Sequence, residues 1–294
     1  MSDDRRPRRP PNRLLTVGSA LALIWLVGLA FMAAFADYLP FIRYATDRSK
    51  QFTNYGIGPG IDYWFGSDRL GRDVFARCIY GAQISLRVAV ASIVVGIVVG
   101  GALGLVAGYF KGRIDSVINV VLDVLLSFPA LILAVLVVGR LDVLAADVGW
   151  LTRTWSVTIV LSLLSIAPIA RIVRAQTFSL SEREFVLAAR SLGAGRSRIL
   201  FREILPNLVP AMVSVAFTGV AVLMVAEGGL AFLGYSVESP SSSWGKMIAE
   251  NREKIDSAWW ATIFPSVMLF ITVLTFNVLG DRFARRFDIR EAAL

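Results

Sequence analysis

The chain has 294 residues, of which 56% are hydrophobic and 18% charged, and its mean hydropathy is +0.65. Soluble domains are only about 45–50% apolar, so this composition indicates an integral membrane protein, and the formal charge of +8 is better explained by membrane topology than by nucleic-acid binding. No histidine and a single cysteine, Cys78, exclude an internal disulfide and Ser-His-Asp or Cys-His catalysis, and they argue against a metal site built on these residues.

Six apolar stretches are long enough to cross a bilayer as helices, which takes roughly 20 residues each. They lie at residues 14–36, 84–110, 114–138, 155–173, 209–232 and 260–279. The first follows a basic leader, but its apolar run of about 22 residues is longer than the roughly 7 to 15 of a secretory signal, so we expect a retained anchor. Pro129 and Pro168 lie inside the third and fourth stretches and are expected to kink those helices.

The distribution of basic residues predicts the orientation. With the N-terminus in the cytoplasm, most Lys and Arg residues fall on the cytoplasmic side, as is usual in membrane proteins. We therefore expect a multi-pass protein of the cytoplasmic (inner) membrane with both termini inside. The predicted parts are a tail with the first helix at 1–40, an external segment at 41–83, a core of five helices at 84–280 with a cytoplasmic loop at 174–206, and a cytoplasmic tail at 281–294.

The second predicted span carries glycines at four-residue intervals. These are Gly96, Gly100, Gly104 and Gly108. Small residues at this spacing form one face of a helix on which a second helix approaches closely, so we expect a packing surface there.

Ionisable side chains inside predicted spans are candidates for function. A charge in that position costs roughly 2.5 to 3.5 kcal/mol on insertion scales, so it normally faces protein or water. Two ionisable residues, Asp123 and Glu227, are gate or pathway candidates, and the aromatic Phe232 is a third. For Glu227 we favour a gate or a polar contact between helices over direct substrate binding, whereas Asp123 is equally compatible with pairing to an arginine.

The cytoplasmic loop predicts a helix, a bend and a second helix. On a helical wheel Phe185, Ala188, Ala189 and Leu192 share one stripe, and Gly193 follows as a left-handed C-terminal break. Alanines on a contact face permit close backbone approach, which suits docking against another protein. An amphipathic helix lying in the lipid interface is the alternative, with its arginines paired to phosphates.

The spacing of this loop resembles the EAA loop of ABC-importer permeases, Glu-Ala-Ala-x3-Gly-x9-Ile-x-Leu-Pro. In that family the loop carries a coupling helix that rests in a groove on the ATPase subunit. Leu187 stands in place of the family's glutamate, and Glu203 in place of its isoleucine. The resemblance implies that the residues coupling to the ATPase are Glu184, Phe185, Ala188, Ala189, Arg190, Leu192, Gly193, Ala194, Leu205 and Pro206.

Three further segments narrow the resemblance to dipeptide and oligopeptide permeases of the DppC/OppC type. They are "FGSDRLGRDVFARCIYGAQISL", "AEGGLAFLGYSVESPSSSWGKMI" and "FNVLGDRFARRFDIR". The family motif in the first is carried by Gly66, Asp68, Gly71, Arg72 and Asp73. The implied fold is an all-α membrane protein with six transmembrane helices and a cytoplasmic coupling-helix loop, the type I ABC importer permease architecture.

The implied function is a non-enzymatic permease subunit that forms half of the path of an ATP-driven dipeptide or oligopeptide importer. The implied partners are a homologous second permease, two ATPase subunits or domains, an extracytoplasmic substrate-binding protein, the peptide and membrane lipid. No cofactor is expected in this chain, because it lacks a phosphate-binding loop and ATP and Mg would be bound by the ATPases.

Several alternatives stay open. Closely similar permeases carry nickel, glutathione or other small solutes. A secondary transporter, which usually has internal repeats, and an intramembrane enzyme are further alternatives. The outer loop at 235–259 is interpreted either as a contact for a substrate-delivering protein or as a re-entrant gate segment.

Overall fold

The computed structural model describes residues 13–39, 42, 56–145, 151–238 and 241–291. Within these ranges the chain is helical, apart from turns and one isolated antiparallel bridge between Ser67 and Asp73. The helices are α1 (Arg13–Ala34), α2 (Val74–Val95), α3 (Gly101–Phe110), α4 (Gly112–Ser127), α5 (Ala130–Ala145), α6 (Arg153–Leu180), α7 (Glu184–Ser191), α8 (Arg196–Arg198), α9 (Leu205–Phe232), α10 (Trp244–Asn251) and α11 (Trp260–Glu291).

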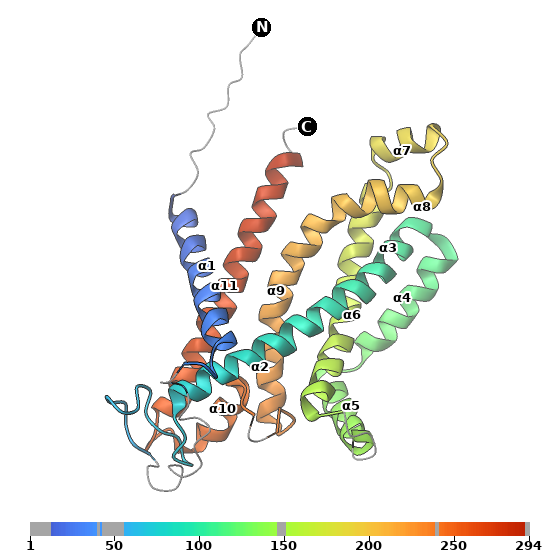
Figure 1. The fold of residues 1–294 in the computed structure, drawn as a ribbon. Coiled ribbons are helices and arrows are strands. Elements are labelled where there is room, and N and C mark those ends of the chain that lie inside the picture. Colours follow the sequence, from blue (N-terminus) through green and yellow to red (C-terminus); the bar gives the residue numbers. More distant parts are fainter. Residues whose placement is uncertain (1–12, 40–41, 43–55, 146–150, 239–240, 292–294) are drawn as a thin grey trace.

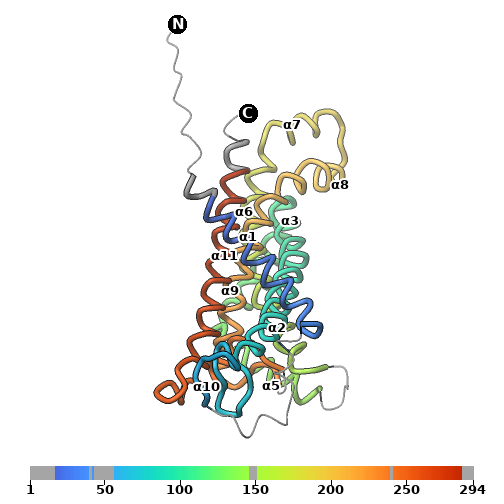
Figure 2. Tube along the Cα trace, turned by 60° about the vertical axis from the view of Figure 1, so that its left-hand side comes forward, coloured from blue at the N-terminus to red at the C-terminus, as the bar shows by residue number. Residues whose placement is uncertain are grey.

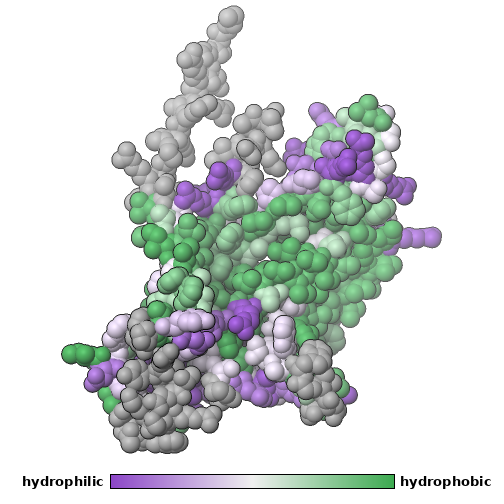
Figure 3. Space-filling view, in the orientation of Figure 1, coloured by the Kyte–Doolittle hydropathy of each residue, from purple (hydrophilic) through white to green (hydrophobic). Residues whose placement is uncertain are grey.

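The long helices form an elongated bundle with two distinct ends. The start of α1, the end of α11 and the short helices α7 and α8 lie at one end, and α5 and α10 lie at the other (Figures 1 and 2). Figure 3 shows a broad apolar face over the middle of the bundle, with polar side chains gathered around α7 and α8. An apolar middle between polar ends is the surface that a bilayer requires.

Five runs of helix in the described chain are long and apolar enough to cross a membrane. They are Val17–Ala34, Val74–Phe110, Arg153–Leu180, Arg196–Phe232 and Trp260–Arg286. The kink predicted at Pro129 is a complete break, because α4 and α5 meet at an angle of 87° and make a sixth span only if the bent pair is counted as one. Phe128 is extended at φ −84° and ψ 135°, since Pro129 disfavours the helical region for the residue before it.

The helix of the second span begins earlier than predicted. Asp73 caps α2 by accepting hydrogen bonds from the backbone N–H of Phe75 (2.8 Å) and of Ala76 (3.3 Å), so the helix starts at Val74 rather than at Ile84. Residues 74–83, which the sequence placed in the external segment, are therefore helical. A π-helical turn at Gly96–Gly100 joins α2 to α3.

The predicted glycine face is formed by the π-helical turn and α3, and it packs against α6. A Cβ on Gly100 would lie 2.5 Å from the carbonyl oxygen of Ile166, and one on Gly108 would lie 2.6 Å from that of Arg174. Side chains do not fit between the two backbones. α6 is 28 residues long in all and is not interrupted at Pro168. It therefore extends past Val173, where the sequence predicted the start of the loop.

Candidate functional site

Two polar regions at opposite ends of the bundle carry the predicted site residues. We call residues 181–204, which contain α7 and α8, the α7 loop. We call the cluster formed by Asp68, Arg72, Arg77, Ser242 and Glu250 the α10 clamp. The two regions are described in turn, followed by the candidates inside the spans.

The backbone of the α7 loop makes the predicted turn. α7 ends at Ser191, and Gly193 adopts φ +79°, in the left-handed region that favours glycine. The N–H of Gly193 donates to the carbonyl oxygen of Arg190, and the N–H of Ala194 to that of Ala189, both at 3.0 Å. These two bonds close the helix, so the direction in which α7 points is set by this turn.

The predicted apolar stripe of α7 divides into an inner and an outer face. Val186 is fully buried, and Ala189 packs against the core from a partly buried position. The side chains of Phe185 and Leu192 are 38% and 88% exposed, and Ala188 is also exposed. One edge of α7 therefore holds the helix to the bundle, while the other leaves apolar side chains uncovered.

The charged residues predicted for this loop flank the uncovered edge. Glu184 and Arg190 are exposed at the two ends of α7. The preceding turn is held by an ion pair between Lys111 Nζ and Glu182 Oε1 at 2.8 Å, and Lys111 also lies 4.0 Å from the centre of the Phe178 ring. The loop is thus tied to the junction of α3 and α4.

The second predicted helix of the loop is the beginning of the next span. α8 passes through a π-helical turn at Ile199–Ile204 directly into α9, so Arg196–Phe232 is one run of 37 residues. Leu205 is partly buried against the core, and Pro206 is the second residue of α9, directly after the π-helical turn. The pair of helices is therefore one short helix and the end of a long one.

The α10 clamp is centred on Asp68, whose side chain is completely buried. Its Oδ1 accepts hydrogen bonds from the backbone N–H of Leu70 at 2.8 Å and of Arg72 at 2.9 Å. Its Oδ2 accepts from Arg72 Nε at 2.7 Å and from Arg77 Nη1 at 2.6 Å. Four charge-assisted bonds compensate the burial of this carboxylate.

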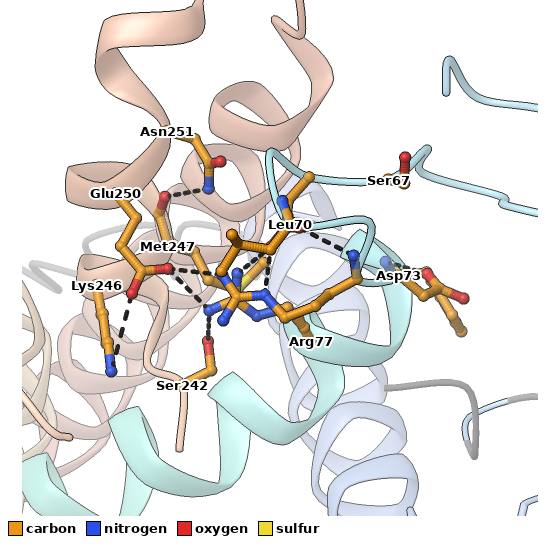
Figure 4. A network of polar contacts seen from close by, with 12 residues as sticks. Ser67, Leu70, Asp73, Arg77, Ser242, Lys246, Met247, Glu250 and Asn251 are labelled. Atoms are coloured by element: carbon orange, nitrogen blue, oxygen red, sulfur yellow. Dashed lines mark hydrogen bonds and ion pairs between the residues drawn. The ribbon is translucent and has the colours of Figure 1, made fainter. Parts of the chain in front are cut away.

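The clamp joins segments far apart in the sequence. Arg72 Nη2 and Arg77 Nη2 donate to the same oxygen of Glu250, at 3.0 and 3.1 Å, and Arg77 Nη2 also donates to Ser242 Oγ at 3.1 Å. Figure 4 shows Arg77 of α2 meeting Glu250 of α10 and Ser242 of the preceding turn. Burial alone would raise the pKa of Glu250, but the charges of Arg77 and Arg72 outweigh it and hold that pKa below its usual value.

The glycines of the same motif permit its turns. Gly66 and Gly71 have φ of +76° and +74°. A Cβ on Gly66 would lie 2.5 Å from the indole of Trp260, whose Nε1 donates to the carbonyl oxygen of Ser67 at 2.9 Å. The predicted motif residues Gly66, Asp68, Gly71, Arg72 and Asp73 are thus brought together, as turn formers, clamp members and the cap of α2.

Arg77 and Glu250 were not predicted as site residues, and Ser242 was placed only within the outer loop at 235–259. Arg77 is 3% exposed and lies one turn after the capping residue in an otherwise apolar helix, a position that signals a buried partner. Ser242 and Glu250 have no local signal, because their partners are more than 160 residues away.

The candidates inside the spans have different surroundings. Glu227 is fully buried, and its Oε1 accepts from Ser236 Oγ at 2.8 Å and from Ser243 Oγ at 2.6 Å. It is a polar contact between α9 and the segment that leads to α10. Asp123 forms an ion pair with Arg171, and both side chains are exposed by half or more.

Two cavities lie along α9. One of about 470 Å³ has mostly apolar walls from α2, α5, α6 and α9. The other, of about 400 Å³, lies beside the α10 clamp and is lined by charged residues and by Phe232, the third span candidate. Among the described residues, no group of three or more Asp, Glu or Cys side chains is placed to hold a metal ion.

Known transport proteins match this chain over most of its length. Residues 96–292 match the family described as binding-protein-dependent transport system inner membrane component. The chain is 34% identical over 271 residues to the dipeptide transport system permease protein DppC of Alkalihalophilus pseudofirmus, covering 92% of this chain and 84% of the relative. It is 37% identical over 277 residues to the glutathione transport system permease protein GsiD of Salmonella typhimurium, covering 94% and 86%.

A putative peptide permease protein of Brucella suis is 37% identical over 286 residues, covering 96% of this chain and 90% of the relative. Among solved structures, a chain of the MetNI methionine ABC transporter in an inward-facing conformation superposes with a TM-score of 0.60 at 20% identity, covering 73% of this chain and 96% of that chain. The likeness confirms the predicted type I ABC importer permease fold.

Proposed function

The chain belongs to the family of binding-protein-dependent transport system inner membrane components, and from this premise we propose that it forms half of the path of an ATP-driven peptide importer. Relatives named as dipeptide and peptide permeases support the substrate class. The subunit itself is non-enzymatic, and its two sides open in turn as attached ATPases bind and release nucleotide.

We propose that the partners are a homologous second permease, two ATPase subunits or domains that bind ATP and Mg, and an external binding protein that delivers the peptide. In this assembly the α7 end lies in the cytoplasm, together with the start of α1 and the end of α11. This orientation is supported by the charge distribution of the sequence and by the common position of these three elements (Figure 1).

The observation that carries the proposal is the uncovered edge of α7. Leu192 is 88% exposed at a polar end of a membrane protein, and an apolar side chain in that position gains free energy when a partner covers it and removes it from water. The edge belongs to a helix whose other side is buried and whose C-terminal turn is closed by two backbone bonds. A firmly held helix with one open apolar edge fits a preformed docking element rather than a flexible linker.

The test is the variant Leu192→Asp in the complex co-expressed with the second permease and the ATPases. Loss of a central apolar contact weakens ATPase association by about tenfold or more, while insertion and pairing with the second permease are unchanged. Ile255→Asp at the α10 end is the matched control, because Ile255 is also an exposed apolar residue. Equal ATPase affinity in both variants would reject the docking role.

Glutathione is the second candidate substrate, because the relative GsiD is named for its transport. Proteoliposomes that hold the complete complex and its binding protein distinguish the two. We expect ATP-dependent uptake of a labelled dipeptide that excess glutathione does not abolish. Uptake that continues without ATP and stops with an uncoupler would instead identify an ion-coupled transporter.

A further inference from the structure

The cavity beside the α10 clamp is lined by charged side chains, whereas the other cavity along α9 has mostly apolar walls. It has a volume of about 400 Å³, within the range of small-molecule sites. Its walls come from the end of α9, the turn that follows, α10 and the first residue of α6. The lining includes Arg153, Phe232, Val237, Lys246, Glu250 and Arg252.

The acidic residues of the lining are already engaged with cations. Glu250 accepts two hydrogen bonds from the arginines of the clamp, which are not themselves part of the cavity wall. Glu238 is mainly exposed, and its Oε1 lies 3.6 Å from Arg153 Nε, too far for a hydrogen bond. The positive charges of Arg153, Lys246 and Arg252 are therefore only partly compensated.

Arg153 has an unused donor at this site. Its Nη2 pairs with Asp142 Oδ2 at 2.7 Å, but its Nε is buried and has no hydrogen-bond partner in the described chain. A buried donor without an acceptor costs about 1–3 kcal/mol, and a charged one more, so such a group in a cavity wall is suited to an incoming acceptor.

Arg252 presents a second guanidinium. Its Cζ lies 5.3 Å from the centre of the Phe232 ring, a distance at which the aromatic face stabilises the cation. No carboxylate in the described parts of the chain pairs with it. The stacked arrangement holds the guanidinium at the wall and leaves its hydrogen-bond donors open to a ligand.

Lys246 contributes a third cation. Its Nζ donates to the carbonyl oxygen of Ser241 at 3.1 Å and lies 3.9 Å from Glu250 Oε1. Burial lowers the pKa of Lys246, partly opposed by the charge of Glu250, and the neighbouring Arg77 and Arg72 lower it further. An anion that enters the cavity relieves this repulsion and stabilises the charged form of the lysine.

We propose that this cavity binds the terminal carboxylate of a peptide in transit, through Arg153, Arg252 and Lys246. The rings and methyl groups of Phe232 and Val237 supply an apolar wall for the last side chain of the peptide. The inference rests on the proposed peptide substrate and deepens it, because it assigns to the α10 end of this subunit a contact with one end of the cargo.

The test pairs a change in the protein with a change in the ligand. Uptake of a dipeptide and of its C-terminal amide is measured in proteoliposomes that hold the complete complex, for the wild type and for the double variant Arg153→Gln and Arg252→Gln. We expect the double variant to lose about tenfold or more of the uptake of the free acid and less than about twofold for the amide. Preferences of the binding protein cancel, because each peptide is compared with itself.

Arg69→Gln is the matched control, since Arg69 is an exposed arginine of the outer segment that does not line the cavity. Equal losses for acid and amide would overturn the inference and assign the cations to an acidic side chain of a partner protein or to folding. Unchanged uptake of both peptides would overturn it as well. Absence of ATP-dependent peptide uptake by the wild type would instead reject the proposed function.

A second measurement needs no binding protein. The natural cysteine Cys78 is fully buried, so Ala249→Cys places a single accessible thiol of this chain in the cavity wall without removing a proposed ligand contact. We expect an anionic methanethiosulfonate to react about tenfold faster than a cationic one of similar size, and the free-acid dipeptide to slow the reaction while the amide does not. Equal rates for the two reagents, or equal protection by the two peptides, would overturn the proposal.

Discussion

The two polar ends of this molecule differ in whether their side chains have partners within the chain. In the α10 clamp every buried charge has a partner within the chain, and Arg72 and Arg77 share the carboxylate of Glu250, which lies 178 and 173 positions further along the sequence. In the α7 loop one edge is anchored and the other leaves Phe185 and Leu192 uncovered. The first region therefore completes the fold of this subunit, whereas in the proposed assembly the second is completed by another protein.

The largest expected effect is at the centre of the clamp. Asp68→Asn removes the buried carboxylate charge that Arg72 and Arg77 share and leaves Arg77 with Glu250 alone, and removing one partner of a buried ion pair costs about 3–5 kcal/mol. We expect a marked fall in the thermal unfolding temperature and in the yield of the purified protein in detergent. Asp62→Asn, in an exposed position of the same segment, is the control. Similar melting of the two variants would show that the clamp is not a structural element.

A smaller effect on stability, with a larger one on coupling, is expected at the turn after α7. Gly193→Val places a β-branched residue at φ +79°, where an ordinary residue costs about 1–2 kcal/mol, and changes the direction of α7. ATP hydrolysis should continue while peptide uptake falls, measured as the ratio of the two rates. Gly195→Val is the control, because Gly195 has φ −68° and no atom close to an added Cβ. A normal ratio of ATP hydrolysis to peptide uptake in Gly193→Val would show that the α7 loop does not need this turn for coupling.

The smallest expected effect is the pH dependence of the clamp. Because the folded-state pKa of Glu250 lies below its unfolded value of 4.5, its contribution to stability is present above that pH and is lost as the pH falls through the lower folded value. We expect acidification below pH 4.5 to lower the free energy of unfolding more in the wild type than in Glu250→Gln, by about 1 kcal/mol or less. Parallel curves for the two proteins would show that the carboxylate titrates without a role in the clamp.

Features set by local physics could be predicted from the sequence. The long apolar runs, the glycine face against α6 and the left-handed break at Gly193 each follow from hydropathy, helical period or a single backbone preference. The motif from Gly66 to Asp73 could be recognised, and its residues do lie together. The apolar stripe of α7 was predicted as a single contact face. A helical wheel does not show that Val186 is the residue buried against the bundle, whereas Phe185 and Leu192 remain uncovered.

Features set by tertiary contacts could not be predicted. A proline indicates a break but not its angle, so the bend between α4 and α5 was expected only as a kink. Glu250 lies in a short polar helix with no signal that its carboxylate meets Arg72 and Arg77. The cavity at Phe232 likewise depends on α6, α9 and α10 converging, which no single segment encodes.

The continuity of α8 and α9 has a mechanical consequence. A run of 37 helical residues extends from Arg196, beside the docking edge, to Phe232, at the wall of the cation-lined cavity. With a rise of 1.5 Å per residue its contour is about 55 Å, longer than the hydrocarbon core of a bilayer. The two ends are therefore joined without a loop, through the π-helical turn at Ile199–Ile204 and past Pro210, and in the proposed assembly this one run of helix connects the ATPase contact with the peptide contact.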